Sequence, residues 1–392
     1  MATTLLSRTL ALLLLALLPW TPARAASLSQ VASFGANPGN LTMYAYRPDG
    51  LASGRPLVVL LHGCTQNAAG YFASSGWRKY ADQWGFALVL AQTGSANNSA
   101  GCFNWFQTGD TTRGQGEAAS IRNMVAHAVA AFGSDPARVH VSGLSAGGAM
   151  TAVMLATYPD VFAAGSIGAG LAYRCATSLT QASSCQYGPT SRTPRQWGDL
   201  VRGAHPGHAG PYPRVAIWQG QSDYTVVPAN GDQLRDQWTD VHGVSQTPTA
   251  TRSLTGGTTL TVYGDDDVRL YEIAGMGHGL PVDPGGAADQ CGATAAYFLD
   301  TICSAYHDAR FFGLDGGAPP TPTPTPTVTP TVPGTCVRAS NYAHTTAGRA
   351  YQSNGYTYAN GSNDPMGLWN TFITHGLRQT GPDHWVLADG EC

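Results

Sequence analysis

A serine in a glycine-rich turn is the first group in this sequence that could act as a covalent nucleophile. Ser145 is the centre of Gly-Leu-Ser-Ala-Gly at 143–147, between an alternating β-branched run at 139–142 and an apolar, helix-like stretch at 149–156. A sharp strand-to-helix turn of this kind raises the serine hydroxyl above the sheet, and glycines two positions to either side leave room for the strained backbone. A glycine-rich turn that holds a serine by chance is the alternative in a chain with 48 glycines. The flanking strand and helix favour the nucleophile.

A serine nucleophile needs a base to accept its proton and an acid to orient that base. His278 stands in the glycine-rich loop 275–279, and Asp223 follows the apolar run 214–220. Both residues come after predicted strands, as Ser145 does. The chain order serine, aspartate, histidine is that of α/β-hydrolases. We therefore predict that Ser145, Asp223 and His278 form a catalytic triad.

Other carboxylates and histidines compete for the acid and base roles, but their places in the chain argue against them. Three aspartates share a turn between two strands, where solvated charges are the ordinary interpretation, and a fourth lies very close to His278 in the sequence. The competing histidines fall within a helix, a strand or a long insertion. These residues are Asp265, Asp266, Asp267, Asp283, His127, His140, His205 and His208.

A second turn, His62-Gly63-Cys64, follows the continuous apolar run at 56–61. In an α/β-hydrolase arrangement this loop supplies half of the oxyanion hole through a backbone N–H. We expect the N–H groups of Ala146 and of Cys64, or a neighbour of Cys64, to hold the oxyanion. His62 belongs either to this oxyanion site or to the framework of the loop, which it would hold by hydrogen bonds. We find no metal-ligand cluster or phosphate-binding loop in the sequence, so neither a cofactor nor a metal is expected.

Three aromatic residues, Phe103, Trp105 and Phe106, crowd a polar loop that follows a glycine, serine and asparagine stretch. They would either form a small satellite core beneath the loop or line the substrate site. A disulfide between Cys102 and Cys64 would place them beside the oxyanion turn. We predict that Phe103 and Trp105 contact substrate.

Apolar runs alternate with helical patterns through most of the chain, which is typical of a mainly parallel sheet with helices on both faces. The fold class is therefore α/β, with the architecture of an α/β-hydrolase. The segment 171–213 loses its periodicity, and such an insertion is usually a lid or a binding loop. Strands are expected at 56–61, 86–91, 139–142, 162–168, 214–220, 259–263 and 268–273, after an early antiparallel strand at 41–48, and helices at 71–84, 116–132, 230–242 and 287–302.

Composition limits the class of partner. Charged residues make up 11% of the 392 residues and the net charge is -3, so nothing steers the chain toward nucleic acid or an acidic membrane surface. The N-terminus combines Arg8, an apolar run at 10–18 and Ala23-Arg24-Ala25, the pattern of a secretory signal peptide. The run is too short to span a bilayer, which takes about 20 residues. We predict a signal peptide over 1–25 and a secreted, extracellular protein.

Eight cysteines on an exported chain imply disulfides, and their even number requires no free thiol. Connectivity cannot be deduced from sequence, but the cysteines fall into neighbouring couples, and this is the pairing that we favour. The couples are Cys64 with Cys102, Cys175 with Cys185, Cys291 with Cys303, and Cys336 with Cys392.

A threonine- and proline-rich segment at 317–334 cannot form helix or sheet and is typical of an extended linker. It would separate a catalytic domain at 26–316 from a module at 335–392, which is small enough for a disulfide to matter. The module is rich in aromatic residues and has no nucleophile constellation of its own, which suggests adhesion to a bulk surface. The residues predicted to make this contact are Tyr342, Trp369 and Trp385.

Several longer motifs accompany the serine turn. In the catalytic part they are Leu61-His62-Gly63-Cys64-Thr65-Gln66 and the segment from Gly275 to Asp283; in the module they are Ala339-Ser340-Asn341-Tyr342-Ala343-His344, Ala347-Gly348-Arg349-Ala350 and Gly367-Leu368-Trp369-Asn370-Thr371-Phe372. With these motifs the chain resembles the extracellular poly(3-hydroxybutyrate) depolymerase family over nearly all of its mature length. It departs in one respect, because a Thr-Pro linker and no fibronectin-type module joins the two parts.

This resemblance implies a secreted bacterial serine hydrolase with an oxyanion histidine upstream of the serine motif, a place that His62 takes here. It also implies that the terminal module anchors the enzyme on water-insoluble polyester granules, from which hydroxybutyrate oligomers and monomer are released.

Two other functions fit parts of the sequence. A feruloyl or acetyl xylan esterase has a similar catalytic domain, and its terminal module would bind carbohydrate with the same flat aromatic surfaces. A non-catalytic adhesin would keep the fold, but the complete set of serine, acid and base argues against it. We predict a monomeric serine esterase that hydrolyses poly(3-hydroxybutyrate), with an insoluble polyester surface as its partner and neither nucleic acid nor membrane.

Overall fold

The computed structural model describes residues 26–188, 190–316, 336–353, 355–381, 384–390 and 392. They belong to two units, Met1–Pro320 and Thr321–Cys392. The predicted signal peptide, 1–25, and the predicted linker, 317–334, lie outside the described residues. None of the helices in the described part of the chain combines the length and the apolar character that a bilayer span requires.

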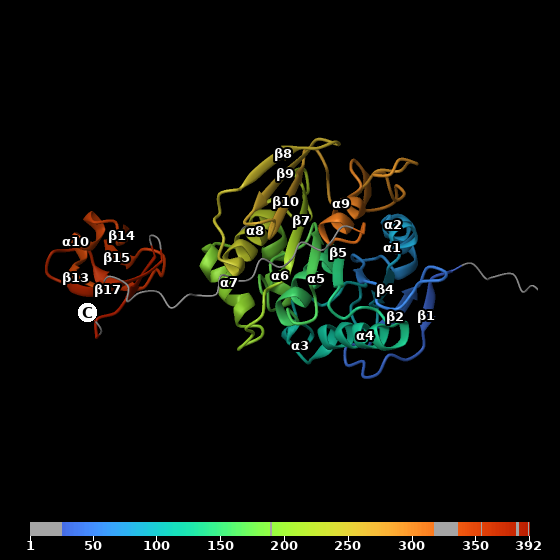
Figure 1. The fold of residues 1–392 in the computed structure, drawn as a ribbon, viewed down its shortest axis with the longest axis horizontal. Coiled ribbons are helices and arrows are strands. Elements are labelled where there is room, and N and C mark those ends of the chain that lie inside the picture. The colour runs from blue at the N-terminus through green and yellow to red at the C-terminus, as the bar shows by residue number, and fades with distance from the viewer. Residues whose placement is uncertain (1–25, 189, 317–335, 354, 382–383, 391) are drawn as a thin grey trace, which may run out of the picture. The chain divides into compact units, whose positions relative to one another are not determined.

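A ten-stranded sheet organises the first unit (Figure 1). Its six central strands run parallel, and two antiparallel strands extend it at each edge. This arrangement confirms the mainly parallel α/β sheet that the sequence predicts. In spatial order the strands are β1 (Ser29–Val31), β2 (Thr42–Tyr46), β4 (Ala87–Gln92), β3 (Leu57–Leu61), β5 (Val139–Leu144), β6 (Ala164–Gly168), β7 (Arg214–Gly220), β10 (Val268–Ile273), β9 (Thr258–Tyr263) and β8 (Ala250–Ser253).

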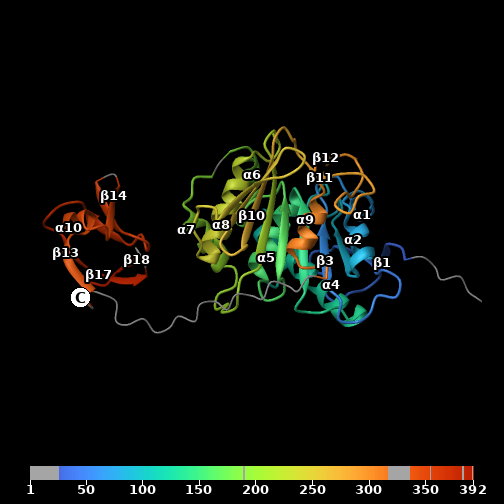
Figure 2. The ribbon, with the colours of Figure 1, turned by 45° about the horizontal axis from the view of Figure 1, so that its top comes forward.

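Alternate side chains of the central strands enter two different hydrophobic clusters, so helices must cover both faces of the sheet. Leu57, Val59 and Leu61 of β3 belong to one cluster, whereas Val58 and Leu60 belong to the other. Figure 2 shows helices in front of and behind the strands. The first cluster includes residues of α4 (Gly116–Phe132), α5 (Ala146–Thr157), α6 (Leu179–Tyr187), α7 (Pro194–Arg202) and α8 (Ala229–His242), and the second residues of α1 (Ala68–Ser74), α2 (Trp77–Trp84) and α9 (Ser304–Phe311).

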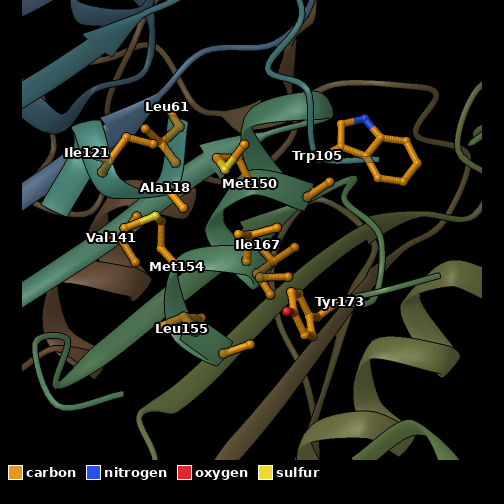
Figure 3. Close-up of a cluster of buried hydrophobic side chains, with 14 of the residues drawn as sticks. Leu61, Trp105, Ala118, Ile121, Val141, Met150, Met154, Leu155, Ile167 and Tyr173 are labelled. Atoms are coloured by element: carbon orange, nitrogen blue, oxygen red, sulfur yellow. The ribbon is translucent and has the colours of Figure 1, made fainter. Parts of the chain in front are cut away.

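Helix α5 is buried along its whole length, which holds its first residue in a fixed place at the edge of the sheet. Figure 3 shows Met150 and Met154 of this helix among Leu61, Val141 and Ile167, which come from three neighbouring strands. Full burial of one such side chain contributes about 2 kcal/mol to folding. Ser145, which immediately precedes α5, is therefore attached to a helix that is packed on all sides.

The single helix predicted at 71–84 is divided into α1 and α2. The break falls at Gly76, which has a φ of 84°. A Cβ atom added at Gly76 would lie 2.4 Å from the Sγ atom of Cys291, so the chain passes too close to this cysteine for any side chain. The helix therefore turns at the one position where the backbone can adopt a left-handed conformation.

The prediction of a helix at 287–302 is wrong. Its backbone groups instead bind other segments, because the Ala293 N–H donates to the Ser74 carbonyl at 3.0 Å and Cys291 pairs with Asp283. A run rich in alanine favours a helix locally, but these tertiary hydrogen bonds use the groups that a helix would need. The segment contains β12 (Phe298–Asp300), which pairs with β11 (Leu280–Val282), and the helix that follows is α9.

The segment 171–213, predicted to lack periodic structure, contains helices α6 and α7. Thr193 and Gln196 form a capping box at the start of α7, which the sequence analysis missed. Trp197 of this helix is fully buried against the main core. At least the α7 part of the insertion is therefore a fixed element of the fold, and its role as a lid or binding loop stays a prediction.

The second unit has its own small core. Its buried residues are Ala350, Ala359, Met366, Leu377 and Trp385. The burial of Trp385 contradicts the prediction that this residue contacts a polymer surface, because its ring fills the centre of the module. The elements are β13 (Cys336–Ser340), α10 (Asn341–Thr346), β14 (Ala350–Ser353), β15 (Tyr356–Ala359), β16 (Pro365–Leu368), β17 (Thr374–Gly381) and β18 (His384–Leu387), arranged as two three-stranded sheets.

The eight cysteines form four disulfides, with the neighbouring couples that the sequence favours. Three of them lie in the first unit and one closes the second. They join Cys64 to Cys102, Cys175 to Cys185, Cys291 to Cys303, and Cys336 to Cys392.

Asp308 of α9 gives the unit a pH-dependent stability. Its carboxylate accepts hydrogen bonds from the Ser166 hydroxyl and the Trp218 indole, and burial raises its pKa to about 7. Between pH of about 4 and about 7 the folded state then holds a proton that the unfolded state has lost, so stability falls as the pH rises. We expect Asp308→Asn to reduce the fall of the urea unfolding midpoint across this range. Parallel midpoint profiles for the two proteins would contradict the assignment.

Candidate active site

Ser145 occupies a strained turn between β5 and α5. Its φ of 57° and ψ of -117° are rare for a residue with a side chain. The turn brings α5 against the end of β3, where a Cβ atom added at Gly147 would lie 2.1 Å from the Leu61 carbonyl oxygen. The glycine two positions after Ser145 is therefore required by a close approach of two backbones, as the sequence motif predicts.

Replacement of Gly147 by alanine tests this packing. The new methyl group has no space, so we expect little soluble protein, or a soluble protein with less than about a tenth of the wild-type esterase rate. Gly94→Ala is a matched control, because a Cβ atom at Gly94 meets nothing within 4 Å. The measurement is soluble yield and hydrolysis of p-nitrophenyl butyrate. Normal activity of Gly147→Ala would show that the turn tolerates a side chain.

The structure brings together the three residues predicted to form the triad. The Nε2 atom of His278 lies 2.9 Å from the Ser145 Oγ atom, and its Nδ1 atom lies 2.7 Å from Oδ2 of Asp223. The other carboxylate oxygen of Asp223 accepts the N–H groups of Thr225 and Val226, each at 2.8 Å. These bonds fix the buried carboxylate, which orients the imidazole so that Nε2 faces the hydroxyl.

The competing acids and histidines bind elsewhere. Asp266 forms ion pairs with Arg214 and Arg269 at the far end of β10. His140 is buried in the core, where it stacks on Phe312, and burial lowers its pKa to about 3. Among the described residues, no group of three or more histidine, cysteine, aspartate or glutamate side chains is placed to hold a metal ion.

The turn after β3 lies directly against Ser145. A Cβ atom added at Gly63 would lie 3.5 Å from the Cβ atom of Ser145. Within the turn, the Gly63 N–H donates to the Gln66 side chain and the Thr65 N–H donates to the Ala100 carbonyl, both at 2.8 Å. In the described part of the chain, the Cys64 N–H has no such acceptor, so it is available to an oxyanion.

The second expected donor is the N–H of Ala146. Ala146 is the first residue of α5, so its N–H has no acceptor within the helix. The dipole of α5 adds partial positive charge at this end. Ala146 directly follows Ser145. Cys64 directly follows Gly63, and Gly63 lies against Ser145. Both predicted oxyanion donors are therefore adjacent to the predicted nucleophile.

The imidazole of His62 holds the turn. It is buried, its Nδ1 atom lies 2.7 Å from the Gly63 carbonyl oxygen, and its Nε2 atom accepts the Thr93 N–H at 3.3 Å. Burial lowers the pKa of His62, so the ring is neutral at neutral pH. Because both ring nitrogens already have partners, the structure favours the framework role that the sequence left open beside an oxyanion role.

The aromatic residues of the loop after Cys102 are core residues. Phe103 is 0% exposed and Trp105 is 7% exposed, and Phe106 is likewise buried. Figure 3 shows Trp105 at the edge of the main hydrophobic cluster, beyond Met150. The prediction that Phe103 and Trp105 contact substrate is wrong, because both side chains are buried in the main hydrophobic cluster. The satellite core was the alternative interpretation.

Exposed aromatic residues do lie beside the triad, but they are not the residues that were predicted to contact substrate. Tyr224, which follows Asp223 directly, is 84% exposed, and the ring of Tyr297 lies 5.9 Å from that of His278. The position of Tyr224 next to the predicted acid could have indicated it. Tyr297 was not recognised as a residue of the site, because it falls within the helix that was wrongly predicted at 287–302.

Comparisons with known proteins place the chain in an esterase family. The profile of the family described as "Esterase PHB depolymerase" matches residues 41–261, which is more than half of the chain. Poly(3-hydroxyalkanoate) depolymerase C of Paucimonas lemoignei is 51% identical over 295 residues, which cover 74% of this chain and 71% of that protein.

Relatives with other names are less similar in sequence. An acetylxylan esterase of Coprinopsis cinerea is 41% identical, over 66% of this chain and 70% of that protein. Among solved structures, an acetyl xylan esterase from Aspergillus awamori has a TM-score of 0.64 and 31% sequence identity, and the alignment covers 74% of this chain and 99% of that chain. This structure has the same fold as the first unit.

Proposed function

Because the chain belongs to the esterase PHB depolymerase family, we propose that it hydrolyses the ester bonds of poly(3-hydroxybutyrate) to hydroxybutyrate oligomers and monomer. It is a carboxylic ester hydrolase. The observation that carries the choice of substrate is the identity of 51% with a poly(3-hydroxyalkanoate) depolymerase, against 41% with an acetylxylan esterase. The hydrogen-bonded serine, histidine and aspartate support the chemistry.

The proposed reaction begins when Ser145 attacks the ester carbonyl carbon. The Nε2 atom of His278 accepts the hydroxyl proton, and Asp223 stabilises the imidazolium that results. The negative charge that develops on the carbonyl oxygen is held by the N–H groups of Ala146 and Cys64. When the tetrahedral intermediate collapses, His278 returns the proton to the departing alkoxide. Water then attacks the acyl-Ser145 ester through the same base, which releases the acid and restores the serine.

The second unit is proposed to bind the polymer surface. Its exposed aromatic residues support this role: the rings of Tyr342 and Trp369 lie 5.5 Å apart, and Tyr356 pairs across β15 and β16 with Leu368, the neighbour of Trp369. Phe372 is 89% exposed. Large exposed apolar residues that follow one another in this way are typical of an interaction surface. We call Tyr342, Tyr356, Leu368, Trp369 and Phe372 the aromatic face.

The domain plan and location follow the same proposal. Residues 26–316 would form the catalytic domain and 335–392 the binding domain, with 317–334 as the tether between them. The predicted signal peptide at 1–25 and the four disulfides support a secreted, extracellular enzyme. The enzyme is also proposed to act as a monomer.

A panel of soluble esters tests the substrate class. The mature chain is incubated with the methyl ester of a 3-hydroxybutyrate trimer, with methyl ferulate and with acetylated xylo-oligosaccharide. We expect kcat/KM for the hydroxybutyrate ester to exceed the other two by at least about tenfold, since discrimination by an apolar pocket is of this order. Faster release of acetate from the xylo-oligosaccharide would instead favour an acetyl xylan esterase.

A further inference from the structure

Glu117, near the start of α4, is a buried carboxylate that the proposed mechanism does not use. Glu117 is 0% exposed, and within the described residues its side chain forms no ion pair with a lysine or arginine. Its oxygens accept the Asn104 N–H at 2.7 Å and the Thr93 hydroxyl at 3.4 Å. Its own N–H donates to Asp110, a second acid that faces it. Burial raises the pKa of Glu117 to about 8. A buried carboxyl group is costly unless its polar atoms are hydrogen-bonded, so the position of Glu117 calls for an explanation.

Two of the groups that Glu117 binds belong to separate segments that contact the oxyanion turn. Thr93 follows β4, and its N–H donates to the Nε2 atom of His62 at 3.3 Å. Asn104 lies in the aromatic loop, which the disulfide from Cys102 joins to Cys64. One carboxyl group therefore holds two of the segments that contact the turn, one through a hydrogen bond to His62 and the other through a covalent bond to Cys64.

The bond from Thr93 determines which ring nitrogen of His62 carries the proton. Because Nε2 accepts the Thr93 N–H, the proton of the neutral ring is on Nδ1. The Nδ1–H group then donates to the Gly63 carbonyl oxygen at 2.7 Å. That carbonyl belongs to the same planar peptide group as the Cys64 N–H, and in a trans peptide the two point in opposite directions. When His62 fixes the Gly63 carbonyl, it also fixes the direction of the Cys64 N–H.

We propose that Glu117 is a positioning residue for the esterase reaction, which orients the Cys64 N–H toward the oxyanion through Thr93, Asn104 and His62. The inference rests on the proposed function only in that this N–H stabilises the tetrahedral intermediate. It assigns to a buried acid, remote in sequence from the triad, a role in transition-state stabilisation.

The expected effect falls on kcat. Negative charge develops on the carbonyl oxygen in the transition state and not in the bound substrate, so a misdirected donor weakens transition-state binding and leaves substrate binding nearly unchanged. Removal of an oxyanion donor costs about 10²–10³ in kcat. Loosening a donor that remains present will cost less, about 10- to 100-fold.

The experiment compares Glu117→Leu, Glu117→Gln and wild type on p-nitrophenyl butyrate, with active sites counted by a serine-directed phosphonate. Glu117→Leu should lower kcat by about 10- to 100-fold and change KM by less than about twofold. Glu117→Gln should keep at least about a third of kcat, because its amide oxygen can accept the Asn104 N–H and its NH₂ group can donate to the Thr93 hydroxyl. Rescue by glutamine but not by leucine separates hydrogen bonding from side-chain volume.

Inhibition by butaneboronic acid provides the readout that a purely structural role would not change. Boronates form a tetrahedral adduct with the serine and place a charged oxygen in the oxyanion hole, so their affinity reports on the donors. In Glu117→Leu the inhibition constant should rise by a factor similar to the fall in kcat. An unchanged inhibition constant would overturn the proposal.

Asp308→Leu is the matched control, since Asp308 is also a buried carboxylate with two hydrogen-bond donors but binds Ser166 and Trp218. It should lower stability and leave kcat per active site within about threefold. An equal loss of kcat in both leucine variants would overturn the proposal.

If Glu117→Leu does not fold, Thr93→Val breaks the Glu117–Thr93 bond and keeps the Thr93 N–H. Thr93→Val should lower kcat and boronate affinity together by about 3- to 10-fold, and no effect on either would contradict the proposal. A wild-type chain without esterase activity would be a failure of the proposed function, not of this inference.

Discussion

Replacing Ser145 by alanine is expected to reduce the hydrolysis of p-nitrophenyl butyrate by about 10⁶-fold, the order of loss found when a serine hydrolase loses its nucleophile. The residual rate would come from the oxyanion donors and from substrate binding alone. His278→Ala should cost a similar factor, because the 2.9 Å contact between Nε2 and the hydroxyl is the route by which the proton leaves. The two losses should not add, since the residues act as a unit.

Ser142→Ala is the control for this prediction. Ser142 lies on β5, three residues before Ser145, and is buried in the same region of the sheet. Its removal should leave kcat within about threefold, and a serine-directed phosphonate should label Ser142→Ala but not Ser145→Ala. Labelling of the Ser145→Ala protein at another serine, or its retention of more than about 1% of the activity, would show that the nucleophile has been assigned to the wrong residue.

Removal of residues 319–392 is expected to separate the two activities of the chain. The first unit contains the triad and both large hydrophobic clusters, and the second unit has a cluster of its own. The truncated protein should therefore fold and hydrolyse p-nitrophenyl butyrate within about twofold of the full chain. Clearing of a poly(3-hydroxybutyrate) suspension should fall by at least about tenfold, because a tethered module raises the effective concentration of the catalytic unit at the surface.

The full-length variants Trp369→Ala and Phe372→Ala attribute this effect to the aromatic face. Both side chains are exposed, so their loss should weaken adsorption to polymer granules without loss of folding. Trp385→Ala is the contrasting variant, because Trp385 is a core residue and its removal should destabilise the module. Undiminished clearing by the truncated chain would contradict the binding role of the second unit.

The sequence was sufficient for the parts of the molecule that depend on local patterns. The apolar runs of β3, β4 and β7 predicted a parallel sheet because strands buried on both faces lack alternation. The positions of Ser145, Asp223 and His278 after such strands predicted that they would lie together, since the carboxyl ends of parallel strands share one edge. Their catalytic roles remain a prediction that the variants above test.

The sequence was not sufficient where tertiary contacts decide. Phe103 and Trp105 are aromatic residues in a polar loop, and their burial depends on a disulfide to Cys64 and on a hydrogen bond from Asn104 to Glu117 that no local pattern reveals. The role of Glu117 was missed for the same reason, because an acid at the start of a helix is ordinarily interpreted as a favourable charge at the helix dipole.

The most direct test of the central claim is the release of hydroxybutyrate from poly(3-hydroxybutyrate) granules by the full mature chain, with Ser145→Ala as the blank. We predict that the wild-type chain clears the suspension and releases soluble hydroxybutyrate acids, whereas Ser145→Ala adsorbs to the granules and releases none. If the wild-type chain cleaves soluble esters but leaves the granules intact, the polyester assignment is contradicted, and an acylated plant polysaccharide becomes the substrate to examine.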